Sequence, residues 1–168
     1  MGHEVILQVS KKPIKKQDYF VADDFYYECR NVIGSGVDYI RDMSKEEMKE
    51  SLEWLEFLPD CYSENAIKFD AKARTMTILS KEAYFKQRYE KVKQACQKII
   101  DDGFDAFAGT GRTFSFFRSL NDIEYYGNDR YGLQISEYAG DTTCIDTFIR
   151  EANDGDVYYF GAVIDFHM

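Results

Sequence analysis

The segment DVYYFGAVIDFHM, residues 156–168, decides the fold class. Its alternate residues form two sets, and both sets are largely apolar. One set contains Tyr158, Phe160, Ala162, Ile164 and Phe166, and the other contains Val157, Tyr159, Gly161 and Val163. A strand that is apolar on both faces is buried on both faces. The segment therefore predicts a central strand, covered on two sides, with its side chains in strict alternation.

Four other stretches have the pattern of strands. They are residues 4–10, residues 67–69 and 76–78, which a five-residue loop at 70–74 joins as a hairpin, and residues 131–136. Together with the last segment they predict a mixed or antiparallel sheet of about five strands.

About four helices are expected beside this sheet. The expected helices cover residues 22–33, 45–58, 80–103 and 141–152. The second opens with a capping box, in which Ser44 and Glu47 bond to each other's backbone amides. We expect Asp141 to cap the fourth. The sequence thus predicts one α+β domain spanning residues 1–168, with the C-terminal strand central.

Residues 104–130 show no clear apolar period. The helix expected over residues 80–103 has the clearest apolar period in the chain. Its apolar stripe, expected to face the core, contains Phe85, Tyr89, Val92, Cys96 and Ile99. On this pattern Cys96 is interpreted as a buried thiol.

The cysteines and histidines exclude several chemistries. The four cysteines are far apart in sequence, so they form no paired zinc motif, and we expect them to be reduced. The two histidines, His3 and His167, stand at the chain ends, and any histidine-based catalytic pair would need one of them. We therefore predict no catalytic residue, no metal ion and no cofactor.

No apolar run is long enough for a membrane span, and the first residues lack the pattern of a signal peptide. The sequence predicts a cytoplasmic protein that does not enter a membrane.

Charge is unevenly distributed along the chain, whose net charge is −9. Residues 17–64 and residues 101–168 each carry a net −9, whereas residues 65–100 carry +6. The basic segment fits either a nucleic-acid contact or the solvated side of a surface helix. Because the whole chain repels phosphate backbones, we favour the surface helix and expect no direct contact with nucleic acid.

The acidic segments favour a basic protein partner. The residues we expect to contact it are Asp23, Asp24, Tyr27, Glu46, Glu50 and Glu53. Carboxylates beside exposed aromatic side chains are typical of protein interfaces, although a plain acidic surface has the same composition. Our first hypothesis is a non-enzymatic interaction protein of the inhibitor, immunity or anti-defence type. The sequence leaves the partner's identity and the oligomeric state open.

The turn at residues 109–113 supports an alternative hypothesis. Gly109, Gly111 and Thr113 could direct backbone amides at an anion, Arg112 could pair with it, and His167 could serve as acid or base. The chain would then be a small phosphate- or nucleotide-binding domain, or an enzyme. The same residues are also typical of a tight turn.

Overall fold

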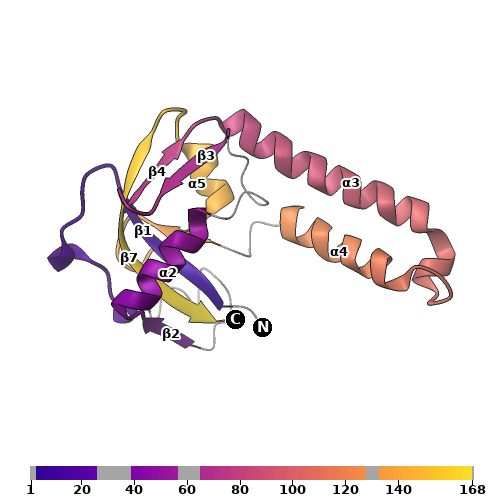
Figure 1. The fold of residues 1–168 in the computed structure, drawn as a ribbon, viewed down its shortest axis with the longest axis horizontal. Coiled ribbons are helices and arrows are strands. Elements are labelled where there is room, and N and C mark those ends of the chain that lie inside the picture. Colours follow the sequence, from indigo (N-terminus) through magenta and orange to yellow (C-terminus); the bar gives the residue numbers. More distant parts are fainter. Residues whose placement is uncertain (1–2, 26–38, 57–64, 128–132, 168) are drawn as a thin grey trace.

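The computed structural model describes residues 3–25, 39–56, 65–127 and 133–167, and its organising element is the last strand, β7 (Val157–His167). On one side β7 pairs antiparallel with β1 (His3–Ser10). On the other side it pairs with β4 (Thr75–Ile78) near its start and with β2 (Tyr39–Asp42) near its end. The prediction of a central C-terminal strand is confirmed (Figure 1).

The remaining strands complete a mixed sheet of seven strands, curved as a half-barrel. β3 (Ile67–Asp70) and β4 form the predicted hairpin. β5 (Gln134–Ser136) lies parallel to β1, and β6 (Thr143–Cys144) lies antiparallel to β5. The α+β class is confirmed. Two strands lie beyond the predicted five, β2 and β6. β6 has only two residues, too few for an alternating pattern, and the last two residues of β2, Arg41 and Asp42, are both charged.

A β-bulge in β7 overturns the expected strict alternation. Leu7 pairs with Val163. Val9 pairs with Phe160, so β7 has one more residue than β1 between these pairs. An extra residue exchanges the faces to which the following side chains point. The main core accordingly contains Tyr158, Phe160 and Val163, and the smaller core contains Ala162, Ile164 and Phe166.

The main core lies between one face of the sheet and the helices α2 (Lys45–Glu56) and α5 (Ile145–Glu151). The predicted apolar face of α5 is buried, but the predicted cap is wrong. Cys144, not Asp141, is the N-cap, and its Sγ accepts from the Thr147 amide at 3.5 Å. The cause is β6, which keeps residues 143–144 in the sheet until the helix begins.

The smaller core lies on the other face of the sheet. It contains Phe25, and partly buried side chains such as Tyr19 and Phe20 pack against it. Of the helix expected over residues 22–33, the structure describes only the first part, where Ala22–Asp24 form a single 3-10 turn, η2. The rest lies outside the described residues.

Two helices extend away from the sheet side by side, and we call them the arm (Figure 1). They are α3 (Lys81–Phe107), which Ser80 caps as predicted, and α4 (Thr113–Gly127). Gly103, with φ 67°, interrupts α3 where the sequence predicted its end. None of the helices within the described ranges is both long and apolar enough to cross a membrane.

The predicted core-facing stripe of α3 is wrong at two positions. Tyr89 and Cys96 are exposed, while Tyr84 and Ala95 are buried. The reason is that α3 leaves the sheet after its first turns and then packs against α4. A helix with one helical neighbour buries a narrower seam than a helix lying on a sheet.

Candidate interaction surfaces

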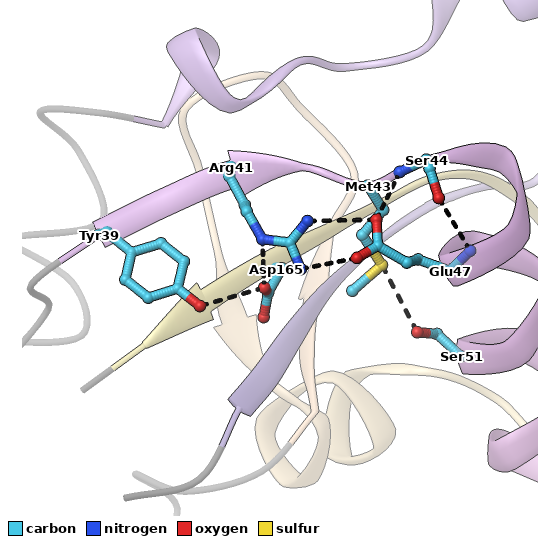
Figure 2. A network of polar contacts seen from close by, with 7 residues as sticks. All are labelled: Tyr39, Arg41, Met43, Ser44, Glu47, Ser51 and Asp165. Atoms are coloured by element: carbon cyan, nitrogen blue, oxygen red, sulfur yellow. Dashed lines mark hydrogen bonds and ion pairs between the residues drawn. The ribbon is translucent and has the colours of Figure 1, made fainter.

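A buried carboxylate on β7 fixes the start of α2 (Figure 2). Asp165 is buried in the central strand, and Arg41 of β2 donates to it from Nε at 2.8 Å. The Tyr39 hydroxyl donates to the same carboxylate at 3.3 Å. Arg41 also donates from Nη1 and Nη2 to the two oxygens of Glu47, at 3.2 and 3.0 Å. β7, β2 and α2 are thus linked through one guanidinium.

The predicted capping box at the start of α2 is confirmed. The Ser44 amide donates to Glu47 at 2.8 Å, and the Glu47 amide donates to Ser44 Oγ at 3.2 Å. The hydrogen bonds from Arg41, followed by those from Ser44, lower the pKa of Glu47 to about 2. Arg41, bonded to Glu47, has its pKa raised above its ordinary value. The first turn of α2 is therefore fixed in two ways, by the capping hydrogen bonds with Ser44 and by the ion pair between Glu47 and Arg41.

The outward side of α2 carries three of the predicted contact residues. Glu46, Glu50 and Glu53 are all exposed, whereas Leu52 and Leu55 are buried in the main core. Because successive helical residues are ~100° apart, these three carboxylates point away from the core. Trp54 is 58% exposed and stands one turn after Glu50. We call Glu46, Glu50, Glu53 and Trp54 the α2 acidic face.

Trp54 was not among the residues selected from the sequence. Its signal is nevertheless present there, because Trp54 falls on the polar side of a helix whose apolar side is already complete with Met48, Leu52 and Leu55. A large aromatic residue at such a position is exposed unless another element covers it.

The structure brings the predicted contacts Asp23 and Asp24 toward the same region. Both are exposed residues of η2, and Asp24 accepts from the Val21 amide at 2.9 Å. The Ala22 amide donates to Asp42 at 2.7 Å, and Asp42 ends β2 three residues before α2 begins. η2 is thus attached beside the start of α2. The remaining predicted contact, Tyr27, lies outside the described residues.

The turn of the alternative hypothesis, residues 109–113, joins the two helices of the arm. Three of its amides already donate within the arm: Gly109 to Ala106 at 3.4 Å, Thr110 to Asp105 at 2.9 Å and Thr113 to Gly111 at 2.9 Å. These bonds leave fewer amides to cradle an anion.

Arg112 and His167 are not brought together. The Arg112 side chain is 84% exposed, and its Nη1 lies 4.0 Å from the buried carboxylate of Asp102. The backbone of His167 pairs with His3 and Tyr39 at the end of β7, and its side chain is outside what the structure describes. In Figure 1 the turn lies at the far end of the arm, away from the sheet that contains β7.

The end of the arm exposes an apolar surface instead. We call this surface the arm tip; its residues are Ile100, Phe104, Phe107, Phe114, Phe117 and Leu120, which are between 41% and 81% exposed. Phe107 and Phe117 each make an edge contact with Phe116, which is buried between the two helices. Grouped exposed apolar side chains mark contact surfaces more often than scattered ones do.

Two further findings concern possible metal sites among the described residues and similarity to known proteins. No group of three or more His, Cys, Asp or Glu side chains within the described ranges could hold a metal ion. In comparisons with known proteins, no family model matched the chain, and neither did any curated protein or solved structure.

Proposed function

We propose that this chain is a non-enzymatic protein-binding module, of the inhibitor, immunity or anti-defence type, whose α2 acidic face binds a basic surface of another protein. The observation that carries the proposal is Trp54, which is 58% exposed beside three exposed carboxylates on a helix fixed to the central strand.

In this proposal Trp54 and the three carboxylates have different roles in binding. Tryptophan is enriched among interface residues that contribute most to affinity, because it buries a large area at low entropic cost. The carboxylates accelerate association with a basic partner and set its orientation. The same charge opposes binding to nucleic acid, since phosphates would be repelled.

The arm tip supports the same class of function. Six large apolar side chains exposed at the end of a projecting pair of helices are typical of a contact surface. We assign the arm tip a second, apolar contact with the partner.

We also propose a cytoplasmic location. The two described thiols, Cys96 and Cys144, support it because neither forms a disulfide.

The test is affinity capture from the native host over a range of salt concentrations. The wild-type chain is expected to retain a defined basic protein at low salt and to release it at high salt, because surface charges are screened. Replacement of Glu46, Glu50 and Glu53 by Lys should abolish capture. Trp54→Ala should weaken it by roughly 10-fold or more, the loss of an interface anchor.

The matched controls are exposed residues elsewhere. Tyr138, in the loop after β5, is 72% exposed, and Tyr138→Ala should leave capture unchanged. Glu82, Glu137 and Glu151 are exposed acids outside the α2 acidic face, and their combined replacement by Lys controls for total charge. Equal loss of capture in this control and in the α2 variant would refute a specific role for the face.

A further inference from the structure

A groove beside α2 is lined mainly by cations, although the chain as a whole is acidic. Its volume is about 820 Å³, and it lies between α2, the loop of the β3–β4 hairpin and the segment 16–19. Its described lining includes one carboxylate, Glu53, and five cations: Lys16, Lys45, Lys49, Lys72 and Arg74. Met48, Leu52 and Ala71 add an apolar part. In a chain of net charge −9 this is a distinct concentration of positive charge.

The first wall of the groove is anchored on the bulge of β7. Gln8 is buried, and its Nε2 donates to the Asp18 carbonyl at 2.9 Å. Its Oε1 accepts from the Phe20 amide at 3.1 Å and from the Ala162 amide at 2.8 Å. One side chain therefore holds the segment that carries Lys16 and Tyr19 against the central strand.

The second wall is anchored at the same bulge. Arg74, with a left-handed φ of 53°, donates to the Gly161 carbonyl and, at 3.4 Å, to the Phe160 carbonyl. Its guanidinium lies 5.5 Å from the centre of the Tyr19 ring, within the range of a cation–π contact. The hairpin loop and the 16–19 segment are thus tied to each other, so the groove is a built feature and not a gap between loose segments.

The lysines at the rim are available to a ligand. Lys16, Lys45 and Lys72 form no ion pair with another described residue, whereas Lys49 lies 3.5 Å from Glu53. Three unneutralised ammonium groups attract an anion, and the apolar part of the lining favours a ligand that also has an apolar body.

We propose that this groove binds a small amphipathic anion, with one carboxylate, sulfate or phosphate head and an aliphatic or aromatic body. The head would lie among Lys16, Lys45 and Lys72, and the body would lie on Met48 and Ala71. The volume is within the range of small-molecule sites, roughly 300–1,000 Å³. Glu53 borders both the groove and the α2 acidic face, whereas Glu46, Glu50 and Trp54 do not line the groove. The groove is therefore a separate site that adjoins the protein interface proposed above.

The experiment is calorimetric titration with octyl sulfate, octyl phosphate and decanoate below their critical micelle concentrations. At least one of the three should bind with a stoichiometry of one. Octyl glucoside has the apolar body without the charge, whereas inorganic sulfate and phosphate have the charged head without the body. Each of these controls should bind at least 10-fold more weakly than the charged amphiphile that binds most tightly. The head preference among the three amphiphiles identifies the anion class.

Variants locate the binding. The triple replacement K16Q/K45Q/K72Q should weaken binding by about 10-fold, the combined effect of three exposed charges. The matched triple replacement K86Q/K93Q/K98Q, at exposed positions of α3, should not change it. F104S/F114S at the arm tip should not change it either, which excludes adsorption there.

Four results would overturn the proposal. The first three are absence of binding by all three amphiphiles, octyl glucoside binding as tightly as the charged amphiphiles, and equal loss of binding in both lysine triples. Tighter binding of an acidic peptide rich in Glu and Leu than of any amphiphile would also overturn it, in favour of a peptide site. Ligand-dependent protection of Lys16, Lys45 and Lys72 from acetylation, read by mass spectrometry, gives a second readout.

Discussion

At the residue scale, Glu47 joins a local helix cap to a long-range ion pair. Its pKa is lowered to about 2 in the folded chain, from about 4.5 in an unfolded one. A group whose pKa falls on folding stabilises the folded state above its unfolded pKa, and this contribution is lost as the pH falls toward the folded value. The stabilisation by Glu47 is therefore present at neutral pH and lost between about pH 4.5 and pH 2.

Glu47→Gln should accordingly lower the free energy of unfolding at pH 7, and the difference from the wild type should shrink steadily below pH 4.5. Urea unfolding at pH 7, 4 and 3 measures this. Glu46→Gln is the control, because Glu46 is an exposed neighbour outside the Arg41 network. A difference that stays constant with pH would show that the carboxylate charge of Glu47 has no role.

The sequence predicted only the local half of this network. The spacing of Ser44 and Glu47 is a short-range signal, so the cap could be recognised. Arg41 and Asp165 are far apart in sequence and meet only because β2 pairs with β7. Three of the contact residues proposed for α2 were recognised from their charge and spacing. Trp54 was missed because the interface hypothesis rested on charged residues and tyrosines.

At the element scale, the packing of Gln8 against the bulge in β7 leaves no room for a side chain at Gly161. A Cβ there would lie 2.1 Å from Oε1 and 2.5 Å from Cδ of Gln8. Gly161→Ala should therefore displace Gln8 from its three hydrogen bonds and destabilise the fold by about 1–3 kcal/mol. Thermal or urea unfolding measures the loss.

A double-mutant cycle identifies the cause. In a Gln8→Ala background the clash is removed, so Gly161→Ala should cost much less than it does in the wild type. Equal costs in both backgrounds would mean that the Gln8 contact is not what requires glycine at this position.

The alternation of apolar residues in 156–168 could not have predicted this bulge, although Gly161, an isolated glycine inside a strand, is a sequence signal for one. The strand is apolar on both faces, so no polar residue marks the point where the faces exchange. The position of a bulge also depends on the partner strand, which the segment itself does not specify. The stripe of α3 was misassigned for a similar reason, because a helical period does not tell whether a sheet or a single helix will cover it.

At the scale of the whole molecule, a buried ion pair joins the arm to the sheet domain. Arg88 of α3 donates to Asp146 of α5 at 2.8 Å, and both side chains are nearly buried. Tyr84 donates to the same carboxylate. Removing one member of a buried pair leaves the other with an uncompensated charge. Asp146→Ala should therefore destabilise the protein by about 3–5 kcal/mol, measured by urea unfolding.

Asp141→Ala is the matched control. Asp141 is exposed and does not cap α5, so this substitution should change the free energy of unfolding by less than about 0.5 kcal/mol. A large loss at Asp141 together with a small one at Asp146 would contradict the description of this junction.

The class and centre of the fold could be predicted because the last strand is apolar on both faces, and such strands lie inside sheets. The arm could not be predicted. Beyond the first part of α3, residues 104–130 show no clear period, and several of their aromatic side chains are exposed at the arm tip. The basic groove could not be predicted either, because its cations come from three separate segments.

The central claim is that the α2 acidic face contacts a basic protein. It is tested most directly by placing a photoreactive p-benzoylphenylalanine at position 54 in the native host, with a second chain carrying it at position 138. We expect irradiation to join position 54 to one predominant basic protein. That adduct should disappear when Glu46, Glu50 and Glu53 are replaced by Lys, and it should be absent from position 138. No adduct at position 54, or the same set of adducts at both positions, would contradict the account.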